Sequence, residues 1–163
     1  MFNRQHRNFP LLSLKSRALR ALSQRDYSRQ ELLLKLTPYA TDEGELERLL
    51  NELELKDFLN EKRNAQSIAL RKESKLGVRR IHAEMKQKGV PSDVAESVLQ
   101  ELKATEIERA QALWLKKFGQ PPRTQKETDQ QMRFMITRGF SSSLLKGIYA
   151  SCKEKAEREQ EEK

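Results

Sequence analysis

Apolar residues recur at a helical spacing through most of the chain, and caps, glycines and prolines interrupt them at intervals. Residues 12 to about 24 form the first such stretch. Its apolar side chains fall on one stripe of a predicted helix and its arginines on another. The apolar stripe is Leu14, Ala18, Ala21 and Leu22, and the basic stripe is Arg17 and Arg20.

Two further helices are predicted before residue 60. Ser28 and Glu31 have the spacing of a capping box, in which each side chain accepts a hydrogen bond from the other residue's backbone N–H. Pro38 ends the helix that this box opens, and Asp42 can cap the next one. In the third helix, the spacing of the leucines predicts a buried stripe of Leu46, Leu49, Leu50 and Leu53.

The same three-helix pattern restarts twice. A second cycle follows directly, and a third begins at Thr105, whose spacing to Glu108 predicts another capping box. The middle helix of each of these cycles ends on a basic residue, a glycine and an apolar residue, at 88–90 and 138–140. Repetition at an interval of about fifty residues is typical of stacked helical units. We expect three repeats, at residues 12–59, 60–104 and 105–152.

The composition favours an all-α fold. Good helix formers dominate the chain, which has 163 residues but only six Gly and five Pro. Because apolar residues make up 36% and charged residues 34%, we expect an elongated array with several small cores. We expect residues 1–11 to be a flexible basic N-terminus and residues 153–163 to be a charged tail that frays into solvent.

The net charge of +8 is unevenly distributed. Residues 1–29 carry seven Lys or Arg against one acid, whereas residues 30–59 carry three against eight. Residues 60–152 are basic again, with eighteen Lys or Arg against ten acids. Such an uneven, mainly basic charge distribution suits a polyanion or an acidic protein surface as partner. The acidic helix at 42–57 can pair with the basic first helix or with basic patches on a partner.

Two sets of basic side chains form a candidate electrostatic surface. Between Arg71 and Lys88 the only acids are Glu73 and Glu84, whereas a solvated face normally mixes charges more closely. The third repeat supplies a comparable set, in which Arg138 directly precedes the second basic-glycine-apolar turn. Composition leaves open whether this surface contacts DNA phosphates or an acidic groove of a protein. The candidate residues are Arg71, Lys72, Lys75, Arg79, Arg80, Lys86, Lys88, Lys116, Lys117, Arg123, Lys126 and Arg133.

Catalytic chemistry has little support in the sequence. His6 and His82 lie far apart, and no metal-binding, phosphate-loop or nucleophile motif is present. Aromatic and methionine side chains between residues 114 and 135 have the spacing of a helical core. The single cysteine, Cys152, excludes an internal disulfide and fits a reducing compartment. Since no apolar run approaches the roughly 20 residues that span a bilayer, we expect a cytoplasmic protein that is not an enzyme and uses no cofactor.

Short motifs follow one another in a characteristic order between residues 20 and 140. They are RALS at 20–23, RDYSRQEL at 25–32, DFLNEKRNA at 57–65, GVRRI at 77–81, KGV at 88–90, KFGQP at 117–121 and RGF at 138–140. Their order resembles the RecX family, bacterial regulators of the RecA recombinase, over about residues 14–150. Asp57 stands where the family usually has glycine, and we expect it to adopt the left-handed conformation. Asn64 replaces a usual aromatic residue, which predicts weaker packing between the first two repeats.

The resemblance implies an elongated, curved array of three three-helix repeats that binds in the groove of the RecA–DNA filament. It also implies inhibition of the ATPase, strand-exchange and coprotease activities of RecA, and thus modulation of DNA repair and the SOS response. The basic residues would dock onto RecA or filament DNA, with weak non-specific DNA binding, and the protein would act as a monomer. The rival interpretation is a tri-helical transcriptional regulator that binds duplex DNA sequence-specifically without RecA.

Overall fold

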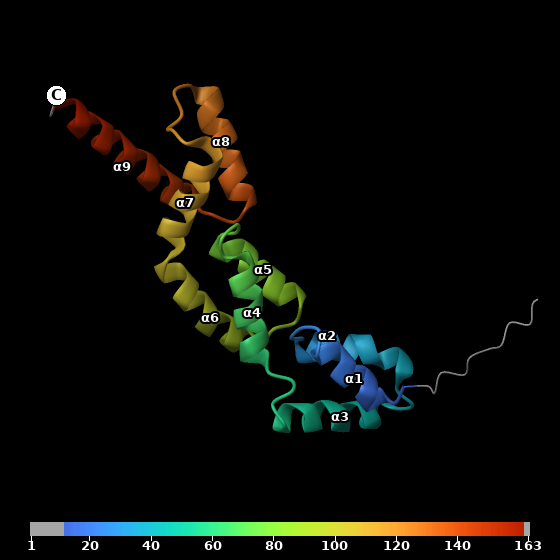
Figure 1. Ribbon diagram of the computed structural model, residues 1–163. Coiled ribbons are helices and arrows are strands. Elements are labelled where there is room, and N and C mark those ends of the chain that lie inside the picture. Colours follow the sequence, from blue (N-terminus) through green and yellow to red (C-terminus); the bar gives the residue numbers. More distant parts are fainter. Residues whose placement is uncertain (1–11, 162–163) are drawn as a thin grey trace, which may run out of the picture. The chain divides into compact units, whose positions relative to one another are not determined.

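The described part of the chain is entirely helical. A computed structural model describes residues 12–161, which form nine α-helices and one 3-10 helix and contain no β-strand. The chain divides into two compact units, one ending at Asn60 and the other beginning at Glu61 (Figure 1). The all-α prediction is confirmed. The predicted flexible segment 1–11 and His6 lie outside the described residues.

The first unit packs three α-helices around a leucine-rich core. The predicted capping box is confirmed, since Glu31 N–H donates to Ser28 Oγ at 3.0 Å and Ser28 N–H donates to the Glu31 carboxylate at 3.2 Å. All four leucines predicted for the third helix are buried in this core. The helices are α1 (Leu14–Leu22), α2 (Arg29–Leu36) and α3 (Glu43–Leu55), with the 3-10 helix η1 (Thr37–Tyr39) after α2.

The acidic residues of α3 pair with basic side chains of the same unit. The Glu52 carboxylate accepts hydrogen bonds from Lys15 Nζ at 2.7 Å and from Lys56 Nζ at 2.6 Å. Arg29 of α2 binds two further glutamates of α3. The hydrogen bond from Lys15, followed by that from Lys56, lowers the pKa of Glu52 from 4.5 to about 2. Of the two roles open to the acidic helix, the structure therefore shows the internal one.

The turn after α3 depends on Asp57. This residue has a φ of 58° and is the one described non-glycine residue with positive φ. Its conformation lets the N–H groups of Phe58 and Leu59 donate to the Leu53 carbonyl at 2.9 and 3.1 Å, which satisfies the end of α3. The predicted left-handed Asp57 is confirmed. Asn64 is fully buried without a described hydrogen-bond partner for its amide, and its effect on packing between repeats stays a prediction.

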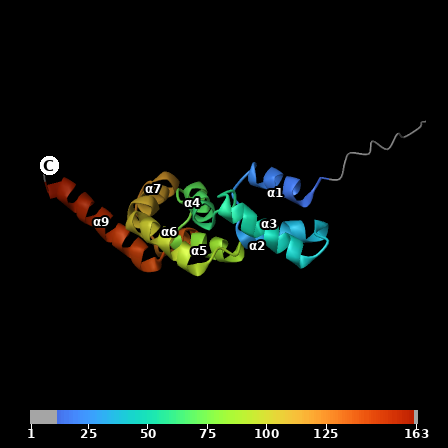
Figure 2. The same ribbon diagram turned by 90° about the horizontal axis from the view of Figure 1, so that it is seen from below.

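The second unit packs six α-helices around two cores (Figures 1 and 2). Trp114 and Met135 are fully buried in the second of these cores, and Phe118, Met132 and Phe134 pack against it, so the predicted core role of these side chains is confirmed. The helices are α4 (Glu61–Lys72), α5 (Val78–Gln87) and α6 (Ser92–Ala104) around one core, and α7 (Glu106–Phe118), α8 (Gln125–Thr137) and α9 (Ser142–Glu161) around the other.

Two local predictions for the second unit are wrong. The capping box at Thr105 is absent, because the Thr105 hydroxyl donates back to the Leu102 carbonyl at 3.4 Å and caps no N–H of α7. The charged tail does not fray over its described part, because α9 continues to Glu161 (Figure 2). Lys, Glu, Arg, Gln and Ala fill that segment, and all five residue types favour helix. The predicted repeat boundaries stay a prediction, while the three clusters of buried residues lie within 14–59, 65–102 and 110–148.

Candidate functional site

The α8–α9 turn packs closely against the start of α5. Gly77 N–H donates to the Arg138 carbonyl at 2.8 Å. A methyl group on Gly77 would lie 2.5 Å from the Gly139 carbonyl oxygen, and one on Gly139 would lie 2.6 Å from the Arg80 backbone nitrogen. The φ of Gly139 is 91°, a conformation that side chains disfavour. The basic-glycine-apolar turn therefore places Arg138 beside the basic start of α5.

Two side chains of α7 stabilise the same junction. Glu106 accepts a hydrogen bond from Val78 N–H at 2.8 Å and thereby caps α5, whose own N-cap residue, Gly77, has no side chain to do so. Arg109 donates to three backbone carbonyls at 2.7 to 3.1 Å. The carbonyls of Glu73 and Leu76 follow the end of α4, and that of Leu102 lies near the end of α6. The second and third predicted repeats are thus joined by hydrogen bonds as well as by close packing.

Two shallow hollows adjoin at this junction and share Phe134 and Arg138. One, of about 850 Å³, lies along α8, and the other, of about 530 Å³, lies between the segment after α4 and helices α7 and α8. The Arg138 guanidinium lies 3.6 Å from the centroid of the Phe134 ring and donates to the Phe134 carbonyl at 3.3 Å. Phe118 packs edge-on against the same ring, at 5.2 Å between centroids. These contacts position the guanidinium between the two hollows.

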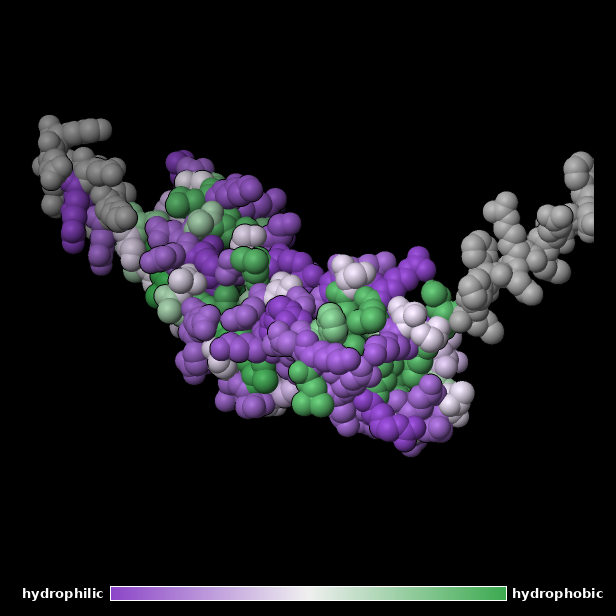
Figure 3. Space-filling model, turned by 60° about the horizontal axis from the view of Figure 1, so that its bottom comes forward, coloured by the Kyte–Doolittle hydropathy of each residue, from purple (hydrophilic) through white to green (hydrophobic). Residues whose placement is uncertain are grey.

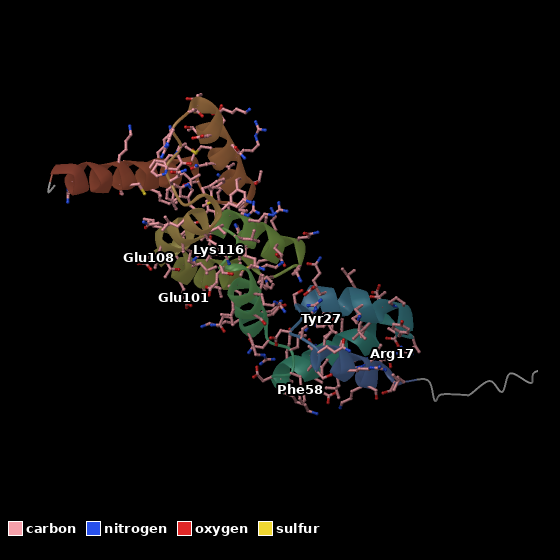
Figure 4. All side chains as sticks on the ribbon, turned by 45° about the horizontal axis from the view of Figure 1, so that its top comes forward. Arg17, Tyr27, Phe58, Glu101, Glu108 and Lys116 are labelled. Carbon is pink, nitrogen blue, oxygen red and sulfur yellow. The ribbon has the colours of Figure 1, made fainter. Side chains whose placement is uncertain are left out.

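The side chains that line the hollows are strongly basic. Six Lys or Arg line them, against a single acid, Asp129. Lys116 (labelled in Figure 4) and Arg133 are exposed and form no ion pair with any described residue. Lys117 lies 5.6 Å from the centroid of the Phe134 ring. The lining cations, which we call the Arg138 surface, are Lys75, Lys116, Lys117, Lys126, Arg133 and Arg138.

The Arg138 surface contains part of the predicted set of basic residues. Arg80 borders it through its contact with Gly139, and Arg79 is exposed beside Arg80 on α5. The sequence places Arg138 in the basic set of the third repeat, directly before the second basic-glycine-apolar turn, but the twelve candidate residues do not include it. Five of the twelve predicted residues line the surface, namely Lys75, Lys116, Lys117, Lys126 and Arg133.

The remaining predicted residues lie away from the two hollows. Lys72 forms an ion pair with Glu84 at 3.7 Å, which links α4 to α5. Arg123 donates to Gln120 within the loop between α7 and α8. Lys86 in the last turn of α5 and Lys88 directly after this helix lie roughly 9 and 12 Å from Arg80 along the helix axis, at 1.5 Å per residue. The partner-binding roles of all twelve predicted residues stay predictions.

The Arg138 surface offers cations and an aromatic ring. Such a surface can recognise an anionic partner by charge and by hydrogen bonding. In the described part of the chain, no three His, Cys, Asp or Glu side chains gather in a way that could hold a metal ion. None of the described helices is long and apolar enough to cross a membrane. Figure 3 shows apolar side chains as separate patches within a mainly hydrophilic surface.

Comparison with known sequences relates the chain to one family. A family model described as the third three-helix domain of RecX matches residues 104–146. A regulatory protein RecX from Leptothrix cholodnii is 44% identical over 141 residues, which cover 86% of this chain and 90% of that relative. A regulatory protein RecX from Ralstonia nicotianae is 42% identical over 137 residues, which cover 84% and 86% of the two chains.

Solved structures show a similar fold. The crystal structure of RecX from Lactobacillus salivarius has a TM-score of 0.74 with this chain at 20% sequence identity, covering 86% of this chain and 94% of the other. A second crystal structure of a regulatory protein RecX has a TM-score of 0.70 at 23% identity, covering 86% and 71%.

Proposed function

The chain belongs to the RecX family of regulatory proteins, and we propose that it regulates the RecA recombinase by binding the RecA–DNA filament through the Arg138 surface. In this proposal the chain lies in the filament groove. Binding there inhibits the ATPase, strand-exchange and coprotease activities of RecA. The protein acts by occupying the filament and carries out no reaction of its own.

The excess of cations at the Arg138 surface is the observation that supports this proposal. Six basic side chains against one acid attract either the phosphates of filament DNA or an acidic protein surface. The glycine contact between Gly77 and Gly139 and the hydrogen bonds of Arg109 hold that surface in place before binding. A preorganised surface loses less conformational entropy on binding than a mobile one, which favours affinity.

Inhibition follows if the protein binds one conformation of the filament better than another. A ligand shifts a conformational equilibrium only by its difference in affinity for the two states. A chain that contacts successive RecA subunits through several repeats gains affinity from effective concentration. It also opposes any change in the spacing of those subunits, and this opposition slows steps of ATP hydrolysis and strand exchange that require such a change.

The proposal is tested by following ATP hydrolysis by RecA on single-stranded DNA. The variant Lys116→Glu with Arg133→Glu reverses one exposed cation in each hollow. Because the reversed charges repel an anionic partner, we expect half-inhibition to require about tenfold more protein or more. The matched control, Lys103→Glu with Lys146→Glu, makes the same charge change at exposed positions on α6 and α9 outside the hollows and should inhibit nearly as wild type.

Circular dichroism checks whether both double variants fold. Equal inhibition by the two folded variants would remove the Arg138 surface from the proposal. No inhibition by the wild-type protein over a wide concentration range would reject the regulatory function itself. Tight, sequence-dependent binding to duplex DNA without RecA would favour the transcriptional regulator instead.

A further inference from the structure

The first unit has its own basic hollow, distinct from the Arg138 surface. It has a volume of about 410 Å³ and lies between α1, α2 and η1. Arg17, Arg20 and Lys35 line it together with Tyr39, and no acidic side chain does so. Arg17 and Arg20 are the basic stripe of the first helix, for which the proposed function has no role. We call this site the Tyr39 hollow.

The cations of the Tyr39 hollow differ from other cations of the same unit. Lys15, Arg25, Arg29 and Lys56 all bind carboxylates within the unit. Arg17, Arg20 and Lys35 form no ion pair with any described residue, although the glutamates of α3 belong to the same compact unit. Three positive charges that converge on one hollow without internal neutralisation repel each other. Such a cluster gains stability when an anion binds.

An exposed aromatic ring lies beside these cations. Tyr39 follows Pro38 in η1, and 54% of its surface is exposed. The Arg17 guanidinium lies over the ring at 3.9 Å from the centroid, while Arg17 Nε donates to the Leu12 carbonyl at 3.1 Å. Ring and guanidinium therefore form a stacked pair at the edge of the hollow (Arg17 is labelled in Figure 4).

We propose that the Tyr39 hollow binds single-stranded nucleic acid. Arg20 and Lys35 hold a backbone phosphate, and an adjacent base stacks on the pair formed by Tyr39 and Arg17. Proteins that bind single strands combine a basic groove with aromatic platforms in this way. Duplex nucleic acid matches the charge but keeps its bases stacked on each other, and an acidic peptide leaves the aromatic platform unused. The proposal concerns the isolated protein and needs no RecA.

The phosphate contact is tested by the salt dependence of binding. The full chain is titrated into a fluorescently labelled oligothymidylate without RecA, and fluorescence anisotropy is followed at several salt concentrations. Because Arg20→Gln with Lys35→Gln removes two cations, the slope of log K against log salt should fall by roughly 1.4. The matched control, Arg48→Gln with Lys103→Gln, removes the same charge at exposed positions outside all three hollows and should leave the slope unchanged. Identical slopes for the two variants would overturn the proposal.

The base contact is tested by Tyr39→Ala, with Tyr39→Phe as the control that keeps the ring. Loss of one stacked base should weaken oligothymidylate binding about 5- to 100-fold. Binding to polyglutamate, which has charge but no bases, should not change. Unchanged oligothymidylate binding by Tyr39→Ala, or an equal loss for polyglutamate, would contradict stacking on Tyr39. Thermal unfolding of Tyr39→Ala and Tyr39→Phe controls for a loss of fold.

Discussion

At the scale of single residues, the ion pairs of Glu52 make the first unit sensitive to pH. In Lys15→Gln the Glu52 carboxyl loses its main hydrogen bond, so its pKa should rise from about 2 toward 4.5. Since the folded pKa is the lower one, the stabilisation by this pair is complete above about 4.5 and is lost as the pH falls toward 2. NMR titration of the Glu52 carboxyl in both proteins measures the shift. The same pKa in both would show that Lys15 does not bind Glu52 in solution.

The Arg109 side chain joins three backbone carbonyls of the second unit, up to 36 positions away in the sequence. Arg109→Met leaves three carbonyls without their charged donor, and we expect a loss of about 3 kcal/mol in the free energy of unfolding. Arg109→Lys keeps the charge but lacks the planar fork, so it should lose about 2 kcal/mol. Trp114 is the single tryptophan and is buried in this unit, so its fluorescence reports denaturant unfolding there. The control Lys103→Met should have a free energy of unfolding within about 0.5 kcal/mol of the wild-type value. If Arg109→Met were equally stable, the stabilising role of the Arg109 hydrogen bonds would be contradicted.

At the scale of the elements, glycines decide how closely α5 and the α8–α9 turn approach. Gly139→Ala combines a positive φ with a clash, so it should destabilise most, by about 3 kcal/mol. Gly77→Ala clashes with backbone and should cost about 2 kcal/mol. Gly119→Ala has only the strain of a φ of 74° and should cost about 1 kcal/mol. Thermal unfolding followed by Trp114 fluorescence gives this order.

Gly147→Ala is a control that should raise the free energy of unfolding, whereas the other three substitutions should lower it. Nothing lies within 4 Å of a methyl group at this helical position, so the change should stabilise α9 by about 0.5 to 1 kcal/mol. A Gly77→Ala variant as stable as the wild-type protein would show that α5 and the turn do not pack closely in solution.

Local signals predicted individual helices well. The capping box at Ser28 and the leucine stripe of α3 depend on residues a few positions apart, which sequence spacing reveals. The same rule failed at Thr105, because α6 and α7 follow each other so closely that its hydroxyl returns to α6. Glu106 caps α5 across 28 positions, and no local pattern distinguishes it from other glutamates.

At the scale of the whole molecule, the sequence predicted a set of candidate basic residues but not where they gather. Lys75 and Lys116 lie in different predicted repeats, and only the packing of α7 beside the end of α4 brings them to one hollow. Lys86 is an exposed lysine like Lys75 and Lys116, yet it lies at the far end of α5, away from the hollows. The Gly77–Gly139 contact places Arg138 beside the start of α5, and sequence periodicity does not reveal this contact.

The most direct test of the central claim is the affinity of the full chain for preformed RecA–single-stranded-DNA filaments. An N-terminal fluorophore reports binding of wild type, of Lys116→Glu with Arg133→Glu, and of the control Lys103→Glu with Lys146→Glu. If the Arg138 surface contacts the filament, the first variant should bind about tenfold more weakly or worse, while the control binds nearly as wild type. Equal affinities of the two variants would contradict the claim.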